Sequence, residues 1–255
     1  MKTTTLLFAL SVFSISAFAA EDAPAARQFQ ALLDEYEEQG GARAYASRFL
    51  HFAEQHQTDP TAADALLWVV KKVRGKSDTT QALEMLAKHH IRSEKLGATC
   101  KDIAKSRSIA AEKLLRAALE SSPHQNVRAQ AGYYLAALLD LESEILDQLK
   151  SQPDLTTRIL QYYGKEYGQH LMLLKPALLE RQREQTYERL LESFSAVEIH
   201  NSTMGEIATK RLFAIRHLTV GKVALEISAE DIHGKAFKLG DYRGKVVMLS
   251  FWGHW

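Results

Sequence analysis

The chain has 255 residues, of which 46% are hydrophobic and 25% charged, a composition typical of a globular protein with one or two domains. Lysine and arginine together number 32, aspartate and glutamate 31, and the net charge is +1. Because basic residues are scattered among acidic ones, the sequence gives no electrostatic support for binding nucleic acid or an anionic membrane surface.

Residues 1–19 have the pattern of a secretory signal peptide. Lys2 supplies a positive start, the run from Leu6 to Ala19 is uncharged, and Ala17-Phe18-Ala19 has the small-x-small pattern that predicts cleavage after Ala19. The run is shorter than the roughly 20 apolar residues that a membrane span needs. We therefore expect an exported, periplasmic or extracytoplasmic protein that contacts a membrane only if this segment stays uncleaved.

The sequence contains a single cysteine, Cys100. Export normally makes disulfides available, but one cysteine can form none within the chain. Such a free thiol is most often a small buried hydrophobic residue, and pairing with a second molecule is the alternative.

Residues 20–218 follow a helical pattern almost throughout. Phe29, Leu32, Leu33 and Tyr36 recur at the spacing of one helix face, and further helices are expected to begin at Asp59-Pro60-Thr61 and at the capping box Thr203-x-x-Glu206. We predict nine or ten helices, hence a mainly α fold. No constant repeat near about 34 or 40 residues is visible, so an irregular bundle and solenoid-like helical hairpins both remain open.

The pattern changes at residues 218–220, where short alternating segments and turn residues replace the helices. Glycine in Asp231-Ile-His-Gly234 predicts a hairpin turn, and the continuous apolar run Val246–Trp252 predicts a strand buried on both faces. The predicted domains are thus a signal peptide (1–19), a helical domain (20–218) and a β-rich segment (219–255).

The β-rich segment resembles the start of the redoxin, or TlpA/ResA-like, branch of the thioredoxin superfamily. That family has a Gly-x-x-Ala-Pro opening, an acidic-Gly-Lys hairpin, a Leu-x-Asp-Tyr-x-Gly-Lys turn and a buried strand ending in Phe-Trp-x-x-Trp. One departure is Leu225, which stands where proline is usual. The matching residues are Gly221, Ala224, Asp231, Gly234, Lys235, Phe237, Leu239, Asp241, Tyr242, Gly244, Lys245, Phe251, Trp252 and Trp255.

The resemblance implies that residues 219–255 form the first β-hairpin and strand of an incomplete thioredoxin-like α/β domain. In its complete form the protein would be an exported thiol–disulfide oxidoreductase or peroxidase-like redoxin without a cofactor. It would act on a protein dithiol or disulfide, or on a peroxide. The residues flanking its active site would be Phe251, Trp252, Gly253, His254 and Trp255.

In the resembled family a Cys-x-x-Cys follows these residues, and its first cysteine attacks a target disulfide while its second resolves the mixed disulfide. Trp255 would shield the disulfide, and His254 would either favour the thiolate or be an exposed spacer. The given sequence holds no such pair, so no catalytic residue is assigned and the chain is expected to be inactive as given. The alternative is a non-enzymatic helical protein that binds a protein partner and carries a vestigial redox tail.

The position at which the sequence stops suggests further hypotheses. One hypothesis is that the next codon is a TGA that encodes selenocysteine. The alternatives are a nonsense mutation, a frameshift or a fragmentary gene model. Separately, none of the ten histidines lies in a His-Glu-x-x-His pattern, so no metal site is predicted.

Overall fold

A computed structural model describes residues 24–73 and 76–250. Within these residues the fold is mostly helical, as predicted, with two small antiparallel sheets. The eleven α-helices are α2 (Pro24–Gln39), α3 (Ala42–Gln55), α4 (Pro60–Lys72), α5 (Lys76–His89), α6 (Leu96–Lys105), α7 (Ile109–Ser121), α8 (Gln125–Ser151), α9 (Thr156–Tyr163), α10 (Lys165–Leu173), α11 (Pro176–Phe194) and α12 (Met204–His217). The strands are β1 (Glu198–Ile199), β2 (Ser202–Thr203), β3 (Ser228–Glu230) and β4 (Ala236–Lys238).

The predicted helix starts are confirmed. The side chain of Asp59 accepts a hydrogen bond from the backbone N–H of Thr61 at 2.8 Å, which satisfies one of the free donors at the start of α4. At the start of α12, Thr203 and Glu206 form both hydrogen bonds of a capping box. Local side-chain chemistry therefore fixes where these helices begin.

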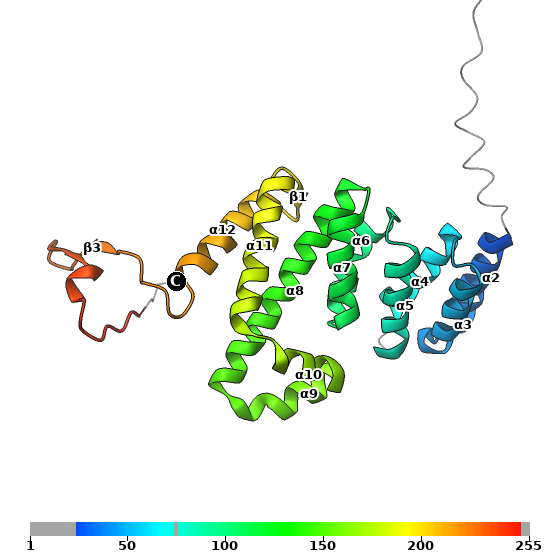
Figure 1. The fold of residues 1–255 in the computed structure, drawn as a ribbon, viewed down its shortest axis with the longest axis horizontal. Helices are drawn as coiled ribbons and strands as arrows, with labels where there is room; N and C mark the ends of the chain where they lie inside the picture. Colours follow the sequence, from blue (N-terminus) through cyan, green and yellow to red (C-terminus); the bar gives the residue numbers. More distant parts are fainter. Residues whose placement is uncertain (1–23, 74–75, 251–255) are drawn as a thin grey trace, which may run out of the picture.

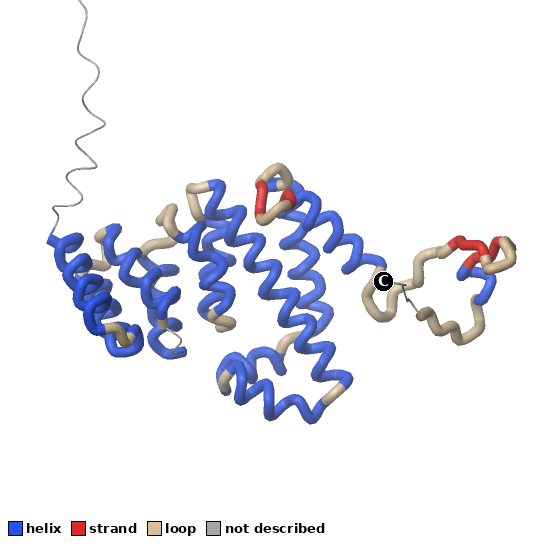
Figure 2. Tube along the Cα trace, turned by 180° about the vertical axis from the view of Figure 1, so that it is seen from behind, coloured by secondary structure: helices blue, strands red, loops and turns tan. Residues whose placement is uncertain are grey.

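The helices lie in an open, elongated row (Figures 1 and 2). From α2 to α5 each helix packs against the next, α6 packs against α4, and α7 packs against α5, α6 and α8. Helices α11 and α12 continue the row on the other side of α8. The short helices α9 and α10 stand apart from the row at the C-terminal end of α8. The long helix α8 is therefore the element against which α6, α7, α10 and α11 pack.

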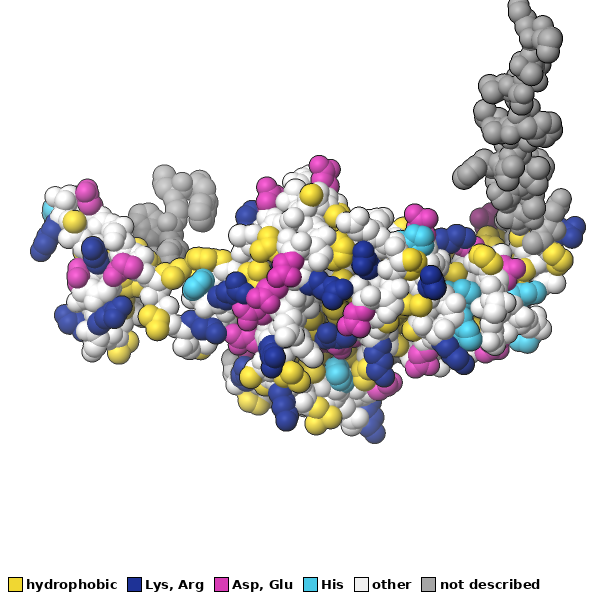
Figure 3. Space-filling view, turned by 45° about the horizontal axis from the view of Figure 1, so that its top comes forward, with side chains coloured by type: hydrophobic (Ala, Val, Ile, Leu, Met, Phe, Trp, Pro, Cys, Tyr) yellow, Lys and Arg dark blue, Asp and Glu magenta, His cyan; other side chains and the backbone are white. Residues whose placement is uncertain are grey.

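A continuous apolar core runs through this row from α2 to α12. A smaller apolar cluster joins α9 and α10 to α8 through Ile145, Ile159, Tyr167 and Leu171. On the face drawn in Figure 3, acidic and basic side chains are mixed along the helical part. None of the described helices is both long and apolar enough to cross a bilayer.

A β-hairpin follows the last helix. Strands β3 and β4 pair with Ala229 opposite Phe237. Gly234 lies in the turn with φ of 74°, a conformation that glycine adopts without a steric penalty. The side chain of Asp231 accepts hydrogen bonds from the backbone N–H groups of His233 and Lys235. The predicted hairpin turn is confirmed, whereas the division of the chain into domains stays a prediction.

The predicted buried strand at 246–252 is wrong for the residues that are described. Residues 246–250 form no strand, and Val246 and Met248 are fully exposed, at 104% and 92%. Residues 223–227 also form no strand. The physical reason is that a strand needs partners for its N–H and C=O groups, and a two-stranded hairpin alone is marginally stable. Residues 251 and 252 lie outside the described residues.

Candidate functional site

The turn residues predicted from the redoxin resemblance are exposed. Asp231 and Gly234 form the turn of the β3–β4 hairpin, and Gly221 lies in the turn after α12. The flanking residues Phe251, Trp252, Gly253, His254 and Trp255 lie outside the described residues.

A second compact turn contains Asp241, Tyr242, Gly244 and Lys245. The side chain of Asp241 accepts a hydrogen bond from the backbone N–H of Lys238 at 3.0 Å. The N–H of Lys245 donates to the carbonyl of Tyr242 at 3.1 Å, and its ammonium lies 5.8 Å from the centre of the Tyr242 ring. These residues hold the turn in shape, and none of them is buried.

Cys100 is a buried thiol on α6. Its Sγ donates to the carbonyl of Leu96 at 3.3 Å, and the side chain has no exposed surface. Burial raises the pKa of the Cys100 thiol to about 12. Because the thiolate is the reactive form, this residue behaves as the small buried hydrophobic residue expected from the sequence.

The most unusual side chain of the helical part is the buried carboxylate of Glu142 on α8. It has 0% exposure, and its Oε1 accepts a hydrogen bond from the Tyr167 hydroxyl at 2.6 Å. Its Oε2 has no hydrogen-bond partner among the described residues. Burial raises the pKa of Glu142 to about 7, with a further contribution from the nearby charge of Glu112, while the Tyr167 hydrogen bond opposes the rise.

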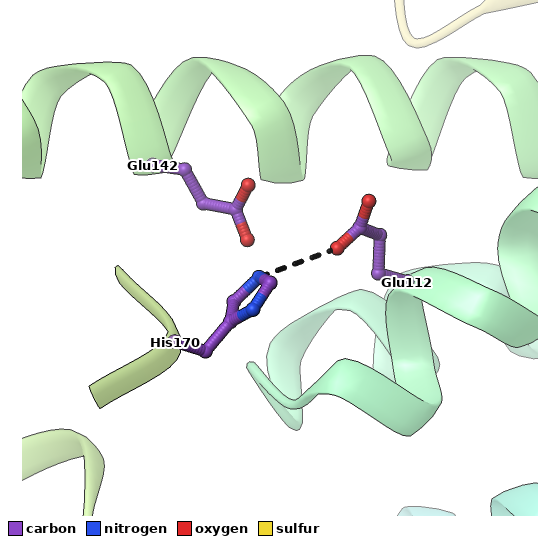
Figure 4. A group of neighbouring side chains, drawn as sticks. All are labelled: Glu112, Glu142 and His170. Carbon is purple, nitrogen blue, oxygen red and sulfur yellow. Dashed lines mark ion pairs between the residues drawn. The ribbon is translucent and has the colours of Figure 1, made fainter. Parts of the chain in front are cut away.

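Two further side chains point at Glu142 from other helices (Figure 4). His170 comes from α10 and Glu112 from α7, and Nε2 of His170 lies 3.7 Å from Oε2 of Glu112. One donor atom from each of the three residues lies within 4.8 Å of the others. We call Glu112, Glu142 and His170 the Glu–His–Glu cluster.

The local helix geometry holds this cluster in place. Arg116 follows Glu112 by one helical turn and donates two hydrogen bonds, at 2.9 and 2.7 Å, to its Oε1. Tyr167 and His170 are three residues apart on α10, so they share one face, and their rings stack with centroids 5.8 Å apart. Tyr167 also lines a cavity of about 710 Å³ that is bounded by the α9–α10 turn, the end of α4, the start of α5 and the α6–α7 connection.

A nearby polar cluster differs in that its buried carboxylate is fully paired. Asp140, also on α8, accepts from Arg183 Nε at 2.8 Å through Oδ1 and from the Tyr187 hydroxyl at 2.6 Å through Oδ2. Both of its oxygens are thus paired, and Arg211 adds an ion pair at 3.5 Å. Such a network ties α8 to α11 and leaves no donor or acceptor for a ligand.

Sequence reasoning missed the Glu–His–Glu cluster. Its members lie on three helices, far apart in the chain, with no metal-binding spacing among them. The only local signals are the pairs Glu112–Arg116 and Tyr167–His170, which are common on helices for structural reasons. The packing of α7 and α10 against α8 brings the residues together.

Comparison of the chain with protein-family models, with curated proteins and with solved structures found no match. The redoxin resemblance therefore rests on the sequence pattern and stays a proposal.

Proposed function

We propose that residues 219–255 are the opening of a redoxin-type domain, and that the complete protein is an exported thiol–disulfide oxidoreductase. The proposal rests on one observation, the ordered series of motif residues from Gly221 to Lys245 followed by the apolar run at 246–252. The hairpin at Asp231–Gly234 and the turn at Asp241–Lys245 are consistent with it.

The exposure of the apolar run supports the same proposal. The side chains at 246–249 have exposures of 104%, 43%, 92% and 51%. Contiguous exposed apolar side chains usually mark a surface that another element covers. In the resembled family the covering elements are the remaining strands and helices of the thioredoxin-like domain.

The proposed chemistry is a thiol–disulfide exchange that needs two cysteines. A thiolate attacks one sulfur of the target disulfide and releases the other target sulfur as a thiol. The second cysteine then attacks the mixed disulfide, so the enzyme dithiol is oxidised and the target is reduced. Cys100 cannot take either role because it is buried with a raised pKa. By the redoxin resemblance, both reactive positions would lie beyond residue 255 in the complete protein.

The second candidate function is a helical interaction protein without enzymatic activity. The open row of helices favours it, because such rows present long surfaces to protein partners. Large apolar side chains are exposed in the row at Leu178 of α11 and Phe213 of α12, and beside it at Tyr162 of α9 and Leu173 of α10.

An activity measurement on the complete protein separates the two functions. The complete protein is expressed, and reduction of insulin disulfides is measured against a variant with serine at both proposed reactive positions. Cys100→Ser serves as the matched control. The oxidoreductase proposal expects activity in the parent and in Cys100→Ser but not in the double serine variant. No activity in the folded parent would favour the interaction protein.

A further inference from the structure

The Glu–His–Glu cluster joins three helices and has polar atoms without partners. Oε2 of Glu142 and Nε2 of His170 are both buried, and neither has a hydrogen-bond partner among the described residues. Buried polar groups in folded proteins are nearly always paired, so two such atoms facing one another require an explanation. We propose that Glu112, Glu142 and His170 bind a divalent transition-metal ion, with Zn²⁺ as the probe.

The ligand set determines the class of metal. One imidazole nitrogen and two carboxylate oxygens suit Zn²⁺ and related transition metals, whereas Mg²⁺ and Ca²⁺ prefer sites made of oxygen alone. A tetrahedral site with ligand distances of about 2.0–2.2 Å places donor atoms about 3.4 Å apart. The donor atoms here lie within 4.8 Å of one another, so side-chain rotations that move these atoms by about 1 Å would complete the geometry. Three protein ligands leave a fourth position for water or another molecule.

The surrounding residues orient the ligands as metal sites require. Tyr167 binds Oε1 of Glu142 and leaves Oε2 directed at the cluster, and Arg116 binds Oε1 of Glu112 and leaves Oε2 toward His170. Hydrogen bonds of this kind to ligating carboxylates fix their orientation. When both carboxylates are ionised, Arg116 balances only one of their two charges, so the cluster attracts a divalent cation.

A protonated His170 bridging the two carboxylates is the competing arrangement. It would pair the same atoms with a proton in place of a metal ion. The two arrangements differ in a direct measurement, because a proton bridge takes up no Zn²⁺. The metal proposal concerns α7, α8 and α10 only, so its failure leaves the redoxin proposal unaffected.

The test is Zn²⁺ binding by the purified chain after treatment with a chelator. Isothermal titration calorimetry gives the affinity, and elemental analysis after dialysis gives the stoichiometry. We expect one Zn²⁺ per chain and no comparable Mg²⁺ binding. Glu142→Gln and His170→Gln should each weaken Zn²⁺ binding by about tenfold or more, on the order seen when a metal site loses a supporting group. The matched control is His51→Gln, because His51 and Glu54 form an exposed His–Glu pair, 3.9 Å apart, that mimics adventitious surface binding.

Three results would overturn the proposal. The first is that the wild-type chain retains no Zn²⁺ after dialysis, a result that can be interpreted without any variant. The second is equal affinity in wild type, Glu142→Gln and His51→Gln. The third is a Co²⁺-loaded chain whose spectrum shows thiolate charge transfer, which would assign the metal to Cys100. Glu142→Gln keeps an oxygen that accepts from Tyr167, so it tests the site if His170→Gln fails to fold.

Discussion

Tyr167 on α10 donates its hydroxyl proton to Oε1 of Glu142 on α8 over 2.6 Å, and both side chains are buried. This bond and the small apolar cluster around Ile159 and Leu171 hold α9 and α10 against the end of α8. It also brings His170, one turn further along α10, to face the same carboxylate. The bond thus links the packing of this helical hairpin to the geometry of the Glu–His–Glu cluster.

Replacing Tyr167 by phenylalanine tests that link. Tyr167→Phe leaves Oε1 of Glu142 buried without its partner, and we expect the free energy of unfolding to fall by about 1–3 kcal/mol near neutral pH. Urea unfolding followed by circular dichroism measures it. The matched control is Tyr162→Phe. Tyr162 is an exposed residue of the adjacent helix α9, so this substitution should change the free energy of unfolding by less than about 0.5 kcal/mol. Equal effects of the two substitutions would contradict the assigned role of Tyr167.

The raised pKa of Glu142 predicts a specific pH dependence of stability. Burial raises this pKa from 4.5 to about 7, so the folded chain retains the proton where the unfolded chain has lost it. The contribution of Glu142 to the free energy of unfolding is therefore fully present below about pH 4.5. This contribution, roughly 3 kcal/mol in total, is lost as the pH rises through about 7.

Glu142→Gln removes this titration while keeping the acceptor for Tyr167. We expect the variant to gain stability relative to wild type as pH rises from about 4.5 to 8, measured by urea unfolding without metal ions. Glu112, Arg116 and His170 face the same carboxylate and remain in the variant. A difference between variant and wild type that does not change with pH would show that Glu142 does not titrate in this range.

Asp140 should contribute far more to stability than an exposed acidic residue. Asp140→Ala leaves Arg183 and Tyr187 without their partner between α8 and α11, and we expect a loss of about 3–5 kcal/mol. The comparison is Glu180→Ala, which removes an exposed ion pair with Lys222 and should cost about 0–1 kcal/mol. Chemical denaturation of both variants measures the difference, and similar losses would contradict this assignment.

The thiol of Cys100 should be protected in the folded chain. Burial raises its pKa to about 12, so little thiolate forms and reagents have no access to it. We expect no rapid reaction with a thiol reagent such as DTNB in buffer and a full equivalent of reaction in denaturant. Rapid modification of the native chain, or a disulfide-linked dimer on a non-reducing gel, would instead support intermolecular pairing.

Features that depend on neighbouring residues in the chain could be predicted from the sequence. Asp59 and Thr203 cap helices through backbone groups within three residues, and Gly234 adopts the φ that its turn requires. The Glu–His–Glu cluster could not be predicted, because it depends on how α7 and α10 pack against α8. The predicted burial of residues 246–249 was wrong. An apolar strand pattern indicates that a segment is suited to burial, but it does not show that neighbouring strands are there to cover it.

The most direct test of the redoxin proposal is the genomic sequence that follows codon 255. We predict an open frame in which a cysteine codon, or a TGA read as selenocysteine, follows Trp255 directly, with a cysteine three positions later and the remaining strands and helices of a thioredoxin-like domain downstream. A downstream sequence with repeated stop codons and no redox motif would contradict the proposal and leave a helical interaction protein.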